Sequence, residues 1–320
     1  MKLSQNRSKI LIIYCGALNI SKAEDLHAWL AEMSELHILA EIEIKMFDLN
    51  PTTETTPDTW LKLARLIFEN YEGYEGFVVL HGIDNILYTA SALSFLLQNL
   101  TKPIIFTGGN FISRSLEKPF LGSGREIGIK ANIINAIQAA TFPIHEVALM
   151  FGNKLLRANQ SYFVNVGGLN FFEAPETAVL GRIDFSIRVY EKNILHNKGY
   201  LKFFDRLETH VFQYAYTPTV EWSRLGEILK NFRGVIIDLG ELRSIPERVE
   251  RFMSDLMKTT IVGVRLKPAY KLQLPKENAI VLSPFTPEAG FAKFMWALGQ
   301  AQDGREAKKL MDKDIAGEFL

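Results

Sequence analysis

The sequence predicts a two-domain α/β protein whose N-terminal domain is built on a doubly wound, mostly parallel sheet. Apolar runs of strand length alternate with segments of helical periodicity between residues 10 and 151, and this alternation is typical of parallel sheets covered by helices. A second, shorter alternation begins near residue 211. Hydrophobic residues make up 48% of the 320 residues, which is ample for two buried cores.

The predicted strands of the N-terminal domain are short apolar runs rich in β-branched residues. The run at 10–14 is ILIIY, the kind of sequence that is buried on both faces of a parallel sheet. Similar runs predict strands at 77–80 and 103–107, and the second of these ends in a Gly-Gly turn. Two further strands are predicted at 38–47 and 147–151.

Amphipathic segments between these strands predict four helices, at 25–36, 57–70, 88–99 and 127–140. In the first helix, apolar residues recur at helical spacing, namely Leu26, Trp29, Leu30, Met33 and Leu36. Thr56 is a suitable N-cap for the second helix, and Pro57 suits its first position.

The C-terminal part predicts a smaller α/β domain. Residues 181–210 are irregular in pattern and rich in charge, so we expect a connecting segment there. The predicted domains are an N-terminal α/β domain at 1–190, a linker at 191–210 and a C-terminal domain at 211–320. Within the last, strands are predicted at 211–216, 234–239, 260–264 and 279–282, and helices at 223–230, 246–258 and 287–298.

Composition excludes several classes of function. Lys and Arg together number 36, as do Asp and Glu, and the zero net charge argues against a nucleic-acid or membrane-surface binder. Cys15 is the single cysteine, so no intrachain disulfide forms, and the six histidines lack metal-ligand spacing. We expect no metal and no cofactor. Neither a signal peptide nor a membrane span is visible, and we expect a cytoplasmic protein.

The turn at 81–85, which is HGIDN, is the first candidate site. Ligands of open α/β sheets bind outside the carboxyl ends of the strands, and right-handed crossovers should bring the turns at 15–20, 81–85 and 107–112 to one edge. Asp84 is therefore a candidate for binding a ligand ammonium group. The alternative is that Asp84 is an N-cap or turn aspartate at a strand-to-helix junction.

Several longer strings resemble the bacterial type I (cytoplasmic) L-asparaginases. The stretch at 77–92 is FVVLHGIDNILYTASA, which is similar to FVVLHGTDTMAYTASA of that family. The stretch at 102–108 is KPIIFTG, which is similar to KPVIFTG, and NKLLRAN at 153–159 resembles NKLLRGN. The turn YCGALN at 14–19 resembles Tyr-Thr-Gly-Gly-Thr-Ile. The resemblance covers nearly the whole chain, strongly in the first domain and weakly in the second.

The resemblance implies a two-domain asparaginase-like fold, a homodimer or homotetramer, and hydrolysis of a side-chain amide through an acyl-enzyme. That chemistry uses two threonines, a lysine and an aspartate, since a hydroxyl needs an adjacent base to become nucleophilic. Here the two threonines align with Leu18 and Ile83, and the lysine aligns with Phe163. Asp84 alone is kept. We expect the three apolar side chains to face one another and to fill the former site.

The remaining candidates each have a structural alternative. Thr52 and Thr53 align near the family's loop for the substrate α-carboxylate, but also suit an ordinary polar loop after a proline. Gly108 is a candidate ligand contact and otherwise serves the geometry of its turn. Cys15 lies in the first turn, where it is either a substitute nucleophile or a small buried residue.

His81 is expected to stabilise its turn, and Lys154 and Arg157 are expected to be structural or interface charges.

Three hypotheses for function follow from these residues. The first is a hydrolysis-deficient relative that binds a small molecule, such as asparagine or aspartate, or acts as a scaffold or regulatory partner. The second is an active amidohydrolase with rearranged groups, using Cys15, Ser21 or Thr107. The third is an interaction protein without a pocket.

Overall fold

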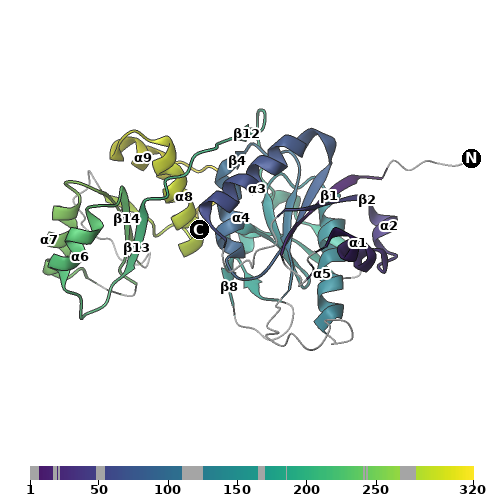
Figure 1. Cartoon of the computed structure of the whole chain (residues 1–320), viewed down its shortest axis with the longest axis horizontal. Coiled ribbons are helices and arrows are strands. Elements are labelled where there is room, and N and C mark those ends of the chain that lie inside the picture. The colour runs from purple at the N-terminus through teal and green to yellow at the C-terminus, as the bar shows by residue number, and fades with distance from the viewer. Residues whose placement is uncertain are drawn as a thin grey trace, which may run out of the picture. The chain divides into compact units, whose positions relative to one another are not determined.

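The computed structural model describes residues 7–16, 20, 22–47, 55–109, 125–164, 170–184, 186–240, 242, 244–266 and 279–320. The chain divides into two compact units, Met1–Phe204 and Asp205–Leu320, and each is considered by itself (Figure 1). The division lies within the segment 191–210 that was predicted as a linker.

The N-terminal unit is built on an eight-stranded mixed sheet with the order β11-β10-β7-β6-β5-β3-β1-β2. Five neighbouring strands run parallel, namely β6, β5, β3, β1 and β2. Beside β6, the strands β7, β10 and β11 pair antiparallel. The predicted doubly wound, mostly parallel sheet is confirmed. The strands are β1 (Lys9–Cys15), β2 (Glu41–Met46), β3 (Gly76–His81), β5 (Ile104–Thr107), β6 (Val147–Phe151), β7 (Lys154–Arg157), β10 (Val179–Ile183) and β11 (Ile187–Val189).

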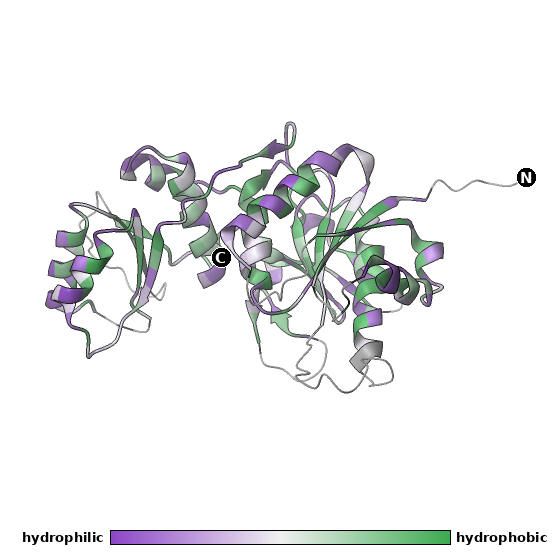
Figure 2. Ribbon diagram, viewed as in Figure 1, coloured by the Kyte–Doolittle hydropathy of each residue, from purple (hydrophilic) through white to green (hydrophobic). Residues whose placement is uncertain are grey.

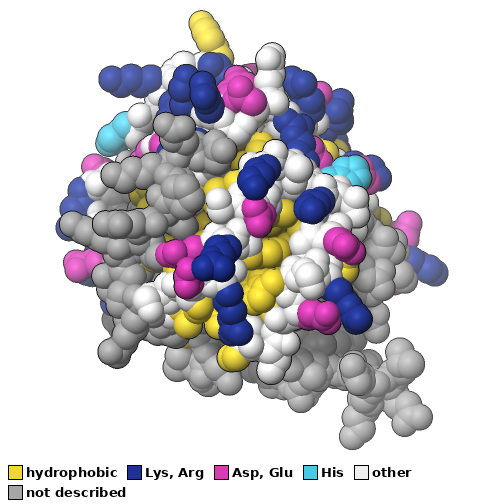
Figure 3. Space-filling model, turned by 90° about the vertical axis from the view of Figure 1, so that its left-hand side faces the viewer, with side chains coloured by type: hydrophobic (Ala, Val, Ile, Leu, Met, Phe, Trp, Pro, Cys, Tyr) yellow, Lys and Arg dark blue, Asp and Glu magenta, His cyan; other side chains and the backbone are white. Residues whose placement is uncertain are grey.

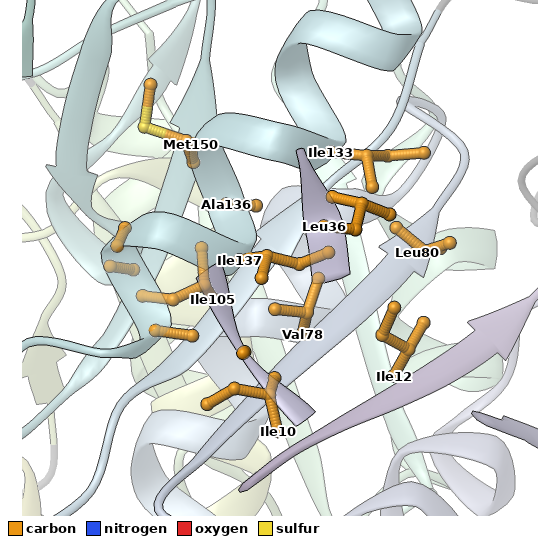
Figure 4. Close-up of a cluster of buried hydrophobic side chains, with 14 of the residues drawn as sticks. Ile10, Ile12, Leu36, Val78, Leu80, Ile105, Ile133, Ala136, Ile137 and Met150 are labelled. Atoms are coloured by element: carbon orange, nitrogen blue, oxygen red, sulfur yellow. The ribbon is translucent and has the colours of Figure 1, made fainter. Parts of the chain in front are cut away.

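Helices cover both faces of this sheet (Figure 1). On one face lie α1 (Ala23–Ala31), α2 (Leu36–Leu39) and α5 (Arg125–Ala140), whose apolar side chains form one buried cluster with those of the strands. Figure 4 shows Ile137 of α5 beside Val78 and Ile105 of the sheet, and Ile133 of the same helix beside Leu36 of α2. On the other face lie α3 (Pro57–Asn70) and α4 (Ile86–Leu96), which pack against each other. Burial of strands on both faces accounts for their continuous apolar sequence, which is visible in Figure 2.

The first predicted helix and the strand after it differ from the structure. The helix at 25–36 is interrupted, since α1 ends at Ala31 and α2 begins at Leu36, although all five apolar residues of the pattern are buried. The strand begins at Glu41, not at residue 38. Ile38 belongs to the short turn of α2 and is 78% exposed, and pairing with β1 starts only at Glu41.

The second predicted helix is confirmed at both ends. Thr56 caps α3 by accepting a hydrogen bond from the backbone N–H of Thr59, and Pro57 is the first helical residue. The third helix, α4, ends at Leu96, before the predicted residue 99. The next residues form β4 (Leu97–Gln98), which pairs with β12 (Lys202–Phe203). The segment 181–210 is thus less irregular than expected, because β10, β11 and β12 lie wholly or partly within it.

The C-terminal unit has a four-stranded parallel sheet in the order β13-β14-β15-β16. The helices α6 and α7 pack together, as do α8 and α9, and α9 was not predicted. The elements are β13 (Val211–Ala215), α6 (Trp222–Leu229), β14 (Gly234–Asp238), α7 (Glu247–Leu256), β15 (Ile261–Arg265), β16 (Ala279–Val281), α8 (Pro287–Gln300) and α9 (Gly304–Met311).

Basic and acidic side chains are interspersed among apolar ones in the described part of the molecular face shown in Figure 3. Among the residues that the structure describes, no helix is both long and apolar enough to cross a membrane. In the same part of the chain, no three His, Cys, Asp or Glu side chains gather in a way that would hold a metal ion.

Candidate functional site

The candidate site lies where the large sheet changes its direction of winding. From β1 the chain continues to β2 on one side, and β3 then returns to the other side of β1. In open α/β sheets, ligands bind in the crevice outside the carboxyl ends of strands at such a switch point. The two strands end together, because Cys15 is in register with His81 and Gly16 forms a further bridge to His81.

The His81 side chain is buried and holds the turn that follows β3. Its Nδ1 donates to the carbonyl oxygen of Gly82 at 2.7 Å. A neutral imidazole has one N–H, so Nε2 accepts from the hydroxyl of Thr89, which lies 3.2 Å away on α4. Burial lowers the pKa of His81 from 6.5 to about 4, although the hydrogen bond to Gly82 opposes this shift. His81 is therefore neutral at pH 7 and stabilises the turn.

Asp84 is exposed in the turn between β3 and α4, and Ile83 beside it is half-buried. The N-cap of α4 is Asn85, which has a left-handed backbone with φ of 58°, and the helix begins at Ile86. The proposed N-cap role of Asp84 is therefore wrong, because Asn85 takes that position. A turn role and a ligand-binding role remain for Asp84.

Gly108 brings the ends of β5 and β3 into close contact. A Cβ atom at Gly108 would lie 2.0 Å from the carbonyl oxygen of His81, which no side chain could tolerate. The carbonyl oxygen of Gly108 accepts a hydrogen bond of 2.9 Å from Nδ2 of Asn132, and Oδ1 of Asn132 accepts from the N–H of Gly152 at 2.9 Å. These contacts give Gly108 a packing role, and they give Asn132 the role of tying β5 to the turn after β6.

Asn132 was not singled out from the sequence. It is a buried polar residue on α5, and a lone Asn within a helical pattern carries no signal for the two backbone groups that it joins.

Two further candidates in the described part of this edge, the hydroxyl of Thr107 and the thiol of Cys15, are buried. Thr107, the last residue of β5, is completely buried and donates its hydroxyl to the carbonyl oxygen of Met150 at 2.6 Å. Cys15, the last residue of β1, is buried, and as the single cysteine of the sequence it forms no intrachain disulfide. The structure thus supports the small buried residue among the two alternatives for Cys15.

Phe163 belongs to a small hairpin of β8 (Tyr162–Phe163) and β9 (Phe172–Glu173). Its ring lies 5.9 Å from that of Phe172, edge to face, and 53% of the residue is exposed. Leu18, Ser21, Thr52 and Thr53 lie outside the described residues. The expected convergence of Leu18, Ile83 and Phe163 therefore stays a prediction.

The two basic residues near this hairpin are paired. Lys154 forms an ion pair with Glu173 of β9. Arg157 is buried and binds the buried Glu146 through Nε at 2.5 Å, and its Nη2 donates to the carbonyl oxygen of Asn193 at 2.6 Å. This pair fastens the segment after β11 to the sheet, so it is a structural feature of the unit and not part of the candidate site.

Comparisons with known proteins agree with one another. Residues 13–195 match the family model described as the N-terminal domain of asparaginase. L-asparaginase 1 of Escherichia coli K12 is 27% identical over 318 residues, covering 92% of this chain and 90% of that protein. The crystal structure of L-asparaginase I from Vibrio cholerae has a TM-score of 0.83 at 28% identity and covers 98% of this chain and 99% of its own. The L-asparaginase of Thermococcus kodakarensis is 25% identical over 88% of this chain and 87% of that protein.

Proposed function

The chain belongs to the asparaginase family, and on this basis we propose that it binds a small molecule at the carboxyl edge of its large sheet without hydrolysing side-chain amides at the rate of an L-asparaginase. The observation that carries the proposal is the turn at 82–84, in which an isoleucine precedes the exposed Asp84. An acyl-enzyme route needs a nucleophilic atom at such a turn, and Ile83 has none.

The groups around this turn support the proposal. The hydroxyls of Thr107 and Thr89 are engaged with the carbonyl of Met150 and with His81, and Cys15 is buried. His81 is a poor general base near pH 7, because its pKa of about 4 is far below that pH and both ring nitrogens are hydrogen-bonded.

Binding without turnover remains chemically reasonable at this edge. Asp84 supplies an exposed carboxylate that suits an ammonium group, and the aligned Leu18 and Phe163 remove the second hydroxyl and the lysine of the family pattern. Loss of such a catalytic set leaves roughly 10³–10⁴-fold acceleration over water from binding and oxyanion contacts. We further propose that the protein is a cytoplasmic homodimer or homotetramer that binds amino-acid-like ligands.

The proposal is tested by two measurements on the purified protein. Ammonia release from L-asparagine should be far slower than for E. coli L-asparaginase 1 under the same conditions. In a thermal-shift screen of asparagine, aspartate and related amino acids, a bound ligand at 100 times its Kd should add about 2.7 kcal/mol to the free energy of unfolding. A rate near that of the E. coli enzyme would refute the proposal, and a flat screen would favour an interaction protein without a pocket.

The alternative function is an active amidohydrolase with rearranged groups. It is favoured by the similarity to L-asparaginase 1 over 92% of the chain. If Cys15 were the nucleophile, Cys15→Ser and thiol alkylation would abolish ammonia release. The matched variant Thr107→Val would do so if the hydroxyl of Thr107 were used instead. Activity that survives all of these changes would exclude both residues.

A further inference from the structure

The β8–β9 hairpin stands at the same edge of the sheet as the turn that carries Asp84. The parallel strands β3, β5 and β6 end side by side at His81, Thr107 and Phe151. The ring of the buried Phe172 in β9 lies 4.9 Å from that of Phe151. Neighbouring strands are about 5 Å apart, so the ends of β3 and β6 are separated by two strand spacings, or roughly 10 Å.

The hairpin is fixed in place, yet one of its aromatic rings is largely uncovered. Phe172 is 2% exposed and anchors β9, while Lys154 is ion-paired with Glu173. The rings of Phe163 and Phe172 meet edge to face, and Phe163 keeps 53% of its surface exposed. An apolar ring held by such an anchor loses little conformational entropy when a ligand covers it, and such preorganisation favours binding.

The groups near this edge define one kind of ligand. Asp84 is an exposed carboxylate, which attracts an ammonium group, and Ile83 adds half-buried apolar surface beside it. The charge of Lys154 is neutralised by Glu173, so the hairpin presents its ring and not a free cation. A polar carboxamide gains little from a phenyl ring, whereas an apolar or aromatic group stacks well against it.

We propose that the site takes an amine whose side group is apolar or aromatic, with Asp84 pairing with the ammonium group and Phe163 as the specificity-determining residue. This inference rests on the proposed function, because it names the class of ligand for the same site. It assigns Phe163 a positive role in ligand selection, in addition to the loss of the family lysine.

L-Phenylalanine and L-asparagine form a suitable pair of probes, since they share the α-amino and α-carboxylate groups and differ only in the side chain. Isothermal titration calorimetry on the full chain should give at least about tenfold tighter binding of L-phenylalanine, as expected for one well-placed aromatic contact. Phe163→Lys should remove this preference, Phe163→Leu should keep part of it, and Asp84→Asn should weaken both ligands.

Tyr200→Ala provides the control, because Tyr200 is 92% exposed and its backbone contacts Asn99, before the start of β5 at the opposite edge of the sheet. It should leave both affinities unchanged. Tighter binding of L-asparagine that depends on Asp84 would overturn the inference and leave the proposed function standing. Absence of binding by either amino acid would overturn both. A change in sedimentation with Phe163→Lys at unchanged affinity would assign the ring to a subunit interface and overturn the inference.

Discussion

Nζ of Lys293 lies 2.5 Å from Oε1 of Glu318, and both side chains are completely buried in the C-terminal unit. Lys293 also donates to the carbonyl oxygens of Met311 at 2.9 Å and Lys313 at 2.6 Å. Glu318 accepts a further hydrogen bond of 2.7 Å from the N–H of Ala316. The pair therefore fastens the last turn of the chain to α8, and every charged group in it has partners.

Breaking this pair should be strongly destabilising. Glu318→Gln leaves the Lys293 ammonium buried without its counter-charge, and removal of one partner of a buried pair costs about 3–5 kcal/mol. Urea unfolding monitored by circular dichroism measures the loss. The control is Asp255→Asn, which breaks the exposed pair with Lys258 (2.7 Å) and should cost less than about 1 kcal/mol. Equal losses from the two variants would contradict this prediction.

Gly108→Ala should destabilise the N-terminal unit. The added Cβ would lie 2.0 Å from a backbone oxygen of His81, and rotation of a side chain cannot relieve that contact. We expect the free energy of unfolding to fall by about 1–3 kcal/mol, as for overpacking in a core. Gly73→Ala adds the same methyl group where no atom lies within 4 Å, and it should change stability by less than about 0.5 kcal/mol. An equally small effect at Gly108 would show that the strand ends separate easily.

Stability should fall as the pH decreases from 6.5 to 4, in part through His81. The folded-state pKa is about 4 and the unfolded value is about 6.5. Between pH 4 and 6.5 the unfolded chain binds more protons than the folded chain, so the free energy of unfolding rises with pH. The contribution of His81 is complete above pH 6.5, and about 3 kcal/mol of it is lost by pH 4. His81→Gln should remove this component from urea unfolding measured across the range. His27→Gln, at an exposed histidine, should keep the wild-type slope.

Asp84→Ala should separate binding from stability. Because Asn85 and not Asp84 caps α4, the substitution should change the free energy of unfolding by less than about 0.5 kcal/mol. It should, however, abolish the stabilisation by amino-acid ligands in the thermal-shift screen. Asp303→Ala is the comparison, because Asp303 caps α9 by accepting from the N–H groups of Arg305 and Glu306, and its loss should cost about 1 kcal/mol. A similar cost at Asp84 would indicate an unrecognised structural role.

Features that depend on neighbours in sequence were predicted well. The run at 10–14 is completely buried in β1, and α3 extends over 57–70 with Thr56 as its cap, as its pattern indicated. Apolar periodicity and capping act over a few residues, so they are visible without the fold. For the candidate site, the sequence points to the turn of Asp84 and predicts that Ile83 replaces a hydroxyl of the family pattern, because both inferences depend on a local string. It did not identify Asn132, whose two partners lie on other elements.

From local sequence alone, the family and the alternation of strands and helices could be inferred, and the replacement of the expected catalytic set stays a prediction. The end of β3 lies against Gly16 and Gly108, and Phe163 packs against Phe172 with about half of its surface exposed; these contacts arise only in the folded chain. The tertiary structure also decided the short antiparallel strands at 154–157, 179–183 and 187–189. The physical reason is that such strands and contacts are stabilised by partners far away in the sequence, and so no local periodicity records them.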